Sequence, residues 1–204
     1  MSSEQLGFAD MLHNAARDNA ARAFDKETTH LPGTWAEALD YHNQQIANHH
    51  AAMLNSDLDL AIDIRKEAHL LAKKLNNGNP GILAGNDAPG CKLDRQAAAQ
   101  DGLIPMWGQS GTFAIEAAGM QVRVTMGGMF GIGATAMPYL GFAARAVDRT
   151  KPFLSATGYR SFLGCTVPPV PGLMVDGLVR RILRAHVTHD LGGRLVPIDP
   201  EWPK

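Results

Sequence analysis

Cysteine is scarce in this sequence, and no charge of either sign dominates it. The two cysteines, Cys91 and Cys165, are too few and too far apart for a cysteine zinc site or a disulfide framework, so we expect two reduced, buried thiols. The 19 basic residues balance the 20 acidic ones, which excludes a strongly basic nucleic-acid-binding chain and an acidic mimic of nucleic acid. Any charged partner must therefore bind to a local patch.

The usual marks of export and of a membrane span are also missing. The first residues, MSSEQLGFADMLHNAARD, do not place a basic segment before an apolar run, as a secretory signal would. The uncharged stretch 124–144 is long enough to cross a bilayer, but it contains five glycines and Pro138. We interpret it as the end of a buried strand followed by a glycine-rich loop, and we expect a cytoplasmic protein without membrane contact.

The patterns that are present predict a helical N-terminal part at residues 1–80. Apolar residues at helical spacing predict an amphipathic helix at 4–24. Two capping patterns follow, Thr34 with Glu37 and Ser56 with Asp59, each of which can satisfy the free amides at the start of a helix. The short polar link between the two helices predicts an antiparallel helical hairpin.

Histidines lie on the apolar side of this hairpin. His42 and His49 share the apolar stripe of its first helix, and His69 lies on its second helix. These three side chains could form a buried cluster that binds a ligand. Packing and a hydrogen bond explain each of them more simply, and we adopt that interpretation.

Residues 81–204 predict an antiparallel sheet with a C-terminal helix. The segment TFAIEAAGMQVRVTM alternates apolar and polar residues around a turn at Ala118 and Gly119, which indicates a hairpin. GFAARAVD and PFLS predict two more strands, and RLVPI a fifth at the edge. The fold class is therefore α+β: an N-terminal helical hairpin plus an extra helix, packed on an antiparallel sheet of four or five strands, with a helix at 174–191. We expect the two parts to share one core.

The stretch SATGYR is the first candidate for a binding site. Ser155, Thr157 and Tyr159 offer hydroxyl groups, and Arg160 adds a guanidinium that can hold a carboxylate or a phosphate. The alternative is a tight corner between two strands, in which the hydroxyls bond their own backbone. Trp107, in the long irregular segment 82–111, is a candidate aromatic contact for a partner.

Two histidines of the C-terminal helix are the second candidate. His186 and His189 lie one turn apart, at a spacing that suits a shared metal or acid–base chemistry. The glutamate of an HExxH motif is missing, so we predict no metal site. The glycine-rich loop has no following lysine and no GxGxxG order, and no GxSxG elbow is present. We therefore expect no cofactor and assign no catalytic residue.

Three segments resemble an uncharacterised protein family of bacterial plasmids and other mobile elements. They are DAPGC at 87–91, FGIGA at 130–134 and KPFLSATGYRSFLG at 151–164. The resemblance covers about the last two thirds of the chain. That family has no activity to carry over, so the resemblance implies an accessory role and assigns no site residue.

Two functions from different classes fit these features. The first is a non-catalytic binding or interaction protein that contacts a protein or a small anionic ligand, with nucleic acid and membrane not expected as partners. The second is a small enzyme that holds an anionic substrate with Arg160 and transfers protons with His186 or His189. The enzyme should bring Arg160 and a histidine into one pocket, whereas the interaction protein should leave an exposed apolar patch near Trp107.

Overall fold

The computed structural model describes residues 3–82, 86–130, 141–163 and 170–202. In these residues it contains five helices and a four-stranded antiparallel sheet, in the order α1–α4, β1–β4, α5. The predicted α+β class with a C-terminal helix is confirmed. None of the described helices is long and apolar enough to cross a membrane.

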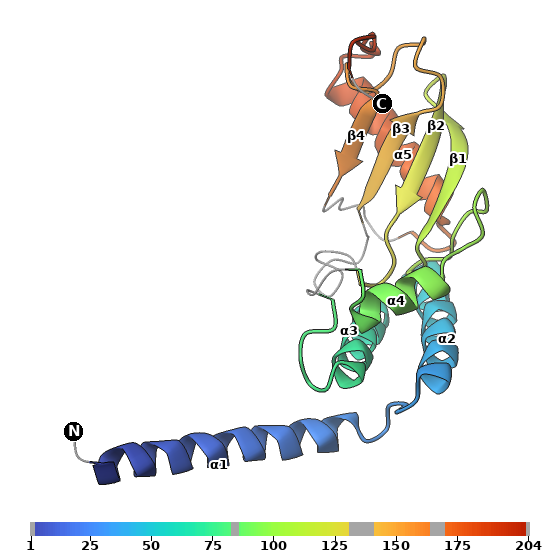
Figure 1. Ribbon diagram of the computed structural model, residues 1–204. Coiled ribbons are helices and arrows are strands. Elements are labelled where there is room, and N and C mark those ends of the chain that lie inside the picture. Colours follow the sequence, from blue (N-terminus) through green and yellow to red (C-terminus); the bar gives the residue numbers. More distant parts are fainter. Residues whose placement is uncertain (1–2, 83–85, 131–140, 164–169, 203–204) are drawn as a thin grey trace.

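Helix α1 (Ser3–Thr28) is longer than the predicted 4–24 and extends away from the rest of the molecule (Figure 1). The side chains of Phe8, Met11 and Leu12 are each more than half exposed. Near its C-terminal end the helix contacts α3 (Leu58–Leu75), where the Lys73 ammonium lies 4.7 Å from the ring centre of Phe24. The anchored part of α1 is therefore its last turns.

Helix α2 (Trp35–Leu54) and α3 form the predicted antiparallel hairpin. Thr34 caps α2, because its hydroxyl accepts a hydrogen bond from the Glu37 amide and donates one to the Glu37 carboxylate. The predicted cap of α3 is wrong by one residue. Asp57, not Ser56, accepts from the Leu60 amide, since Ser56 has a φ of 60° and ends the turn after α2.

The sheet is a meander of β1 (Gly111–Ala117), β2 (Met120–Met126), β3 (Phe142–Ala146) and β4 (Tyr159–Phe162), with neighbours paired in chain order. The predicted two-residue turn between β1 and β2 is confirmed. Ala118 and Gly119 have φ values of 50° and 77°, which suits the turn type that matches the twist of a hairpin.

The position of the fourth strand differs from the prediction. PFLS and RLVPI meet only in a single bridge between Phe153 and Val196. The fourth strand is instead Tyr159–Phe162, which begins in the stretch SATGYR, for which a tight corner was one of the two interpretations. Its pairing with β3 brings the rings of Phe162 and Phe142 into a stack with centres 4.8 Å apart, and this tertiary contact outweighs the polar local sequence.

Helix α5 (Val175–His189) covers one face of the sheet (Figure 1). The buried side chains of β1, β2 and β3 alternate with exposed ones and point to this helix. Together with the buried side chains of α5 they form a hydrophobic cluster, which also includes Trp107 and, from the hairpin, Ala52 and Met53. A second cluster lies between α2, α3 and α4 (Pro89–Gln96) and takes in Phe130 beyond β2. Sheet and helical hairpin therefore share buried side chains.

Candidate functional site

The hydroxyl groups of the SATGYR stretch are used by their own backbone. Ser155 Oγ donates to the Tyr159 carbonyl at 2.7 Å, and Thr157 Oγ1 accepts from the Tyr159 amide at 3.2 Å. The two hydroxyls lie 3.0 Å apart. Together they satisfy both backbone groups of Tyr159 on the side of β4 that faces away from β3. The hydroxyls stabilise the start of an edge strand, so they do not form the anion site considered above.

Removing these hydroxyls is expected to lower the stability of the chain. The double variant Ser155→Ala, Thr157→Val deletes three hydrogen bonds to Tyr159, each worth about 1 kcal/mol or less at this exposed corner. We expect the free energy of unfolding in urea to fall by about 1 to 2 kcal/mol. An unchanged free energy of unfolding would contradict this structural role.

Trp107 is not the exposed aromatic contact that we predicted. Its side chain is 1% exposed and packs in the cluster beneath the sheet. The indole nitrogen donates to the Leu173 carbonyl at 2.8 Å, and the backbone amide donates to His50 Nδ1 at 3.1 Å. Trp107 therefore links the helical hairpin to the segment that begins α5, and no partner can reach its ring.

Arg160 lies on the face of the sheet that α5 covers. It pairs in register with Ala144, and Phe162 pairs with Phe142; both partners in β3 are buried toward α5. Tyr159 and Ser161 consequently point to the opposite face. The predicted contact set is thus divided: Arg160 belongs to the α5 side, whereas the Tyr159 ring lies on the open side of the sheet.

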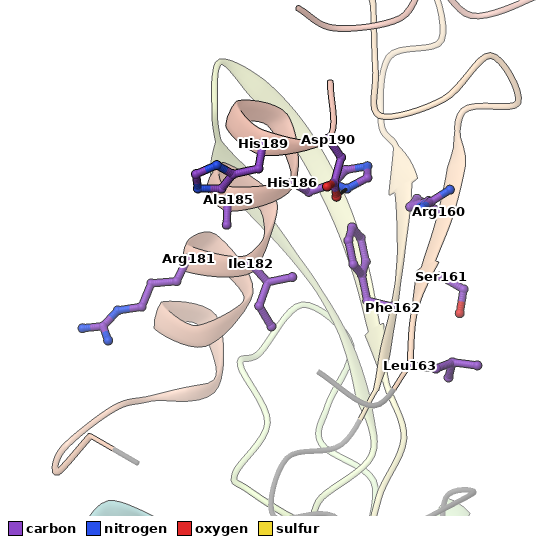
Figure 2. A pocket seen from close by; sticks show the side chains of 10 residues that line it. All are labelled: Arg160, Ser161, Phe162, Leu163, Arg181, Ile182, Ala185, His186, His189 and Asp190. Carbon is purple, nitrogen blue, oxygen red and sulfur yellow. Dashed lines mark hydrogen bonds and ion pairs between the residues drawn. The ribbon is translucent and has the colours of Figure 1, made fainter. Parts of the chain in front are cut away.

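A groove of about 520 Å³ runs between β4 and α5, and it brings Arg160 together with both histidines of the C-terminal helix. Phe162 and Ile182 lie between strand and helix, whereas Arg181 and His189 extend from the side of α5 that faces away from β4 (Figure 2). Two arginines therefore line a partly apolar groove, Arg160 from β4 and Arg181 from the outer side of α5. The sequence analysis singled out only the two histidines of this helix and did not connect Arg181 with Arg160.

His186 is held by Asp190 in this groove. Its Nδ1 lies 2.5 Å from Asp190 Oδ2, and its side chain is 7% exposed. The ring of Phe162 packs edge-on at 5.3 Å, and Nε2 is buried without a hydrogen-bond partner. If Nδ1 carries the proton that Asp190 accepts, Nε2 is the basic nitrogen.

The two histidines do not converge on one point. His186 points toward the sheet, and His189 points away from it (Figure 2). Among the described residues, no group of three histidine, cysteine, aspartate or glutamate side chains could hold a metal ion. Cys91 is half-buried and free, and Cys165 lies outside the described residues. Most of the glycine-rich loop, 131–140, also lies outside them.

The histidine cluster of the helical hairpin is present and includes an arginine that the sequence analysis missed. His42, His49 and Arg65 are each 0% exposed, and His69 bonds the Met129 carbonyl at 3.1 Å. Burial lowers the pKa of His42 to about 4. Burial, helped by the charge of Arg65, lowers that of His49 to about 3. A signal for Arg65 existed, because it shares a helical face with Ala61, Ala68 and Ala72.

This cluster is a structural element of the interior and not an open site. The Phe130 ring lies 5.1 Å from His42 and 5.5 Å from His69 and closes it on one side. A methyl group on Gly108 would come within 2.8 Å of His49 Nδ1, so the loop also lies directly against it. We therefore adopt the groove between β4 and α5 as the candidate functional site.

Comparisons with known proteins give two similar sequences. The chain is 37% identical over 163 residues to an Escherichia coli protein named Protein KlcB, and the match covers 76% of this chain and 33% of that protein. A second Escherichia coli Protein KlcB is 38% identical over 117 residues, or 55% of this chain and 26% of that protein. The chain thus spans about a third or less of these relatives. No protein-family model and no solved structure matches it.

Proposed function

We propose that this chain is a non-catalytic binding protein whose contact site is the groove between β4 and α5, and that its partner presents an acidic segment. The observation that carries this proposal is that an arginine from each element lines the groove, Arg160 from the strand and Arg181 from the helix, with apolar side chains between them. Among the described residues, neither guanidinium lies within ion-pair distance of a carboxylate. Two exposed, unpaired arginines are available to an anionic partner.

The floor of the groove favours a peptide over a free anion. Phe162, Ile182 and the methyl of Ala185 line it, and Leu163 is 76% exposed at one end. Apolar side chains of a partner could pack here while its carboxylates reach the two arginines. An accessory role for a plasmid or another mobile element is part of this proposal and rests on the resemblance of the three sequence segments described above.

Catalysis is the second candidate, and the His186–Asp190 pair is the observation that favours it. Arg160 and His186 do line one groove, as an enzyme for an anionic substrate requires. Two features favour binding instead. The basic nitrogen of His186 is buried, and Ser161, the hydroxyl residue of the groove, points away from His186 (Figure 2). An acid–base catalyst must reach its substrate, which this imidazole does not.

Charge reversal at the two arginines of the groove tests the proposed function. The probe is a fluorescein-labelled peptide of alternating glutamate and leucine, with binding followed by anisotropy. We expect Arg160→Glu, Arg181→Glu to weaken binding about tenfold or more, because two attractive contacts become repulsive. The control, Arg184→Glu, Arg194→Glu, makes the same change in net charge at exposed positions outside the groove and should bind as wild type.

Three outcomes would contradict the proposal: no binding of the peptide by wild type, equal weakening in both double variants, or hydrolysis of an anionic ester that His186→Gln abolishes. Hydrolysis that depends on His186 would favour the enzyme as the function of this chain, since it would give the buried imidazole a chemical role. A probe of alternating lysine and leucine serves as the charge control and should not bind.

A further inference from the structure

In the described part of the chain no helix or strand covers the face of the sheet opposite α5, and two arginines stand at its centre (Figure 1). Arg123 of β2 and Arg145 of β3 are exposed on this face and are directly opposite each other in register. The Val147 amide donates to the Gln121 carbonyl, so alternation makes Arg123 and Arg145 a hydrogen-bonded pair, with Cα atoms about 5.5 Å apart. Two guanidinium groups thus begin from neighbouring points on one surface.

This arrangement opposes the stability of the sheet. Like charges directly across from each other in neighbouring strands destabilise the pair. Among the described residues, neither arginine forms an ion pair; the carboxylate on the same face, Glu116, accepts a hydrogen bond from Gln121 instead. A surface that retains an uncompensated pair of fixed cations is suited to an anion that bridges them.

An aromatic ring lies next to Arg145 in the cross-strand row of Arg123 and Arg145. Tyr159 of β4 lies across from Arg145, and the guanidinium carbon of Arg145 lies 4.6 Å from the centre of the Tyr159 ring. The Tyr159 side chain is 38% exposed, on a strand whose start is fixed by the hydroxyls of Ser155 and Thr157. An exposed tyrosine beside a guanidinium is a surface on which a nucleobase can stack.

The next row of the same face carries small polar groups. Thr112 and Thr125 are paired across β1 and β2 with their hydroxyl oxygens 3.4 Å apart, and Ser161 lies at the far end of that row in β4. Because these side chains are short, they leave Arg123 and Arg145 accessible to a ligand on this face. Their hydroxyls can also bond a sugar or a phosphate. The open face therefore offers cations, a stacking ring and hydroxyl groups within one short patch.

We propose that the open face of the sheet binds a nucleoside phosphate, with Arg123 and Arg145 holding the phosphate and Tyr159 stacking on the base. The phosphate bridges the two guanidinium groups and removes their mutual repulsion. The same chemistry is presented by a free nucleotide and by one unit of a single strand. This site lies on the opposite face of the sheet from the groove and stands independently of the function proposed for it.

The proposal gives a prediction in which stability and binding change in opposite directions. Arg123→Glu places a carboxylate opposite Arg145 and turns a repulsive pair into an attractive one. We expect its midpoint of urea unfolding to rise, while its affinity for a nucleotide falls about tenfold or more. A merely structural arginine would not couple a gain in stability to a loss of binding.

The test uses the full chain at low salt with two probes, a fluorescent methylanthraniloyl-AMP and a fluorescein-labelled oligothymidylate, read by anisotropy. Arg123→Glu should weaken both probes, and Tyr159→Leu should weaken both without changing competition by inorganic phosphate. Arg184→Glu, which makes the same change in net charge on α5, should bind as wild type. An oligothymidylate that binds no tighter than the nucleotide supports a free nucleotide, and one that binds much tighter with a steep salt dependence supports a single strand.

Three results would overturn the proposal. The first is that wild type binds neither probe, and the second is that Arg123→Glu keeps wild-type affinity. The third is that Arg184→Glu loses as much affinity as Arg123→Glu, because net charge alone would then explain the loss. Inorganic phosphate competing as strongly as AMP would also exclude the base-stacking part of the assignment. The groove variant Arg160→Glu, Arg181→Glu should leave both probes bound, which separates this site from the groove.

Discussion

Between pH 7 and pH 5 the free energy of unfolding is expected to fall by about 4 kcal/mol, because two buried histidines resist protonation in the folded chain. Burial lowers the pKa of His42 to about 4 and that of His49 to about 3, whereas an unfolded histidine has a pKa near 6.5. The unfolded chain therefore takes up protons first as the pH falls. Stability is complete above about pH 6.5 and is lost toward the two folded values, with about 2 kcal/mol from each histidine at pH 5.

The surroundings of these rings support the direction of the effect. All four ring nitrogens of His42 and His49 are buried, so a proton would bring a charge into the interior. The contacts of His42 with Gln45 and of His49 with the Trp107 backbone favour the proton, but burial outweighs them. The positive charge of Arg65 adds to the lowering of the pKa of His49. Burial also lowers the pKa values of His50 and His69, so these two groups act in the same direction.

The variant that checks this prediction is His42→Leu, His49→Leu, with urea unfolding followed by circular dichroism from pH 7 to pH 5. Leucine fills the site without titrating, so most of the loss of stability across this range should disappear. The control His13→Leu, His189→Leu changes two exposed histidines and should unfold as wild type at each pH. The same steep loss in the buried-site variant and in wild type would show that other groups cause the acid sensitivity.

The second large effect is expected at Trp107. Trp107→Ala should lower the free energy of unfolding by about 4 kcal/mol, because it leaves a large cavity beneath the sheet. The same change removes the indole donor and leaves the Leu173 carbonyl without that hydrogen bond in a buried position. Since the indole packs in one cluster with Ala52 and Met53 of the hairpin and bonds Leu173 just before α5, its loss should affect helix and sheet signals together.

Two other variants separate packing from the hydrogen bond. Trp107→Phe keeps most of the apolar volume and should lower the free energy of unfolding by about 2 kcal/mol. Trp202→Ala removes a tryptophan that is 51% exposed and should change stability by less than about 0.5 kcal/mol. If Trp107→Ala and Trp202→Ala had similar effects in urea unfolding, Trp107 would not be a core residue.

Local patterns predicted the elements that depend on local physics. The turn at Ala118 and Gly119 needs positive φ values, and the alternation on either side of it fixes which side chains are buried, so the β1–β2 hairpin was predictable. The Thr34 cap was predictable for the same reason, because a hydroxyl three residues before a glutamate satisfies a free amide directly.

Features that depend on tertiary contacts were not predictable from those patterns. YRSF is polar and short, and it becomes a strand because β3 pairs with it and Phe142 stacks on Phe162. Trp107 lies in a segment without periodicity, so only the packing of that segment could show its burial. The meeting of Arg160 with His186 requires β4 to be the edge strand beside α5, which no spacing in the sequence specifies.

The most direct test of the proposed function is an amide chemical-shift titration of the full chain with the peptide of alternating glutamate and leucine. The account predicts shift changes confined to β4 and to the part of α5 that lines the groove, including Phe162, Ile182 and His186. These changes should disappear in Arg160→Glu, Arg181→Glu and persist in Arg184→Glu, Arg194→Glu. Changes centred on another surface, or none at saturating peptide, would contradict the assignment of the groove as the contact site.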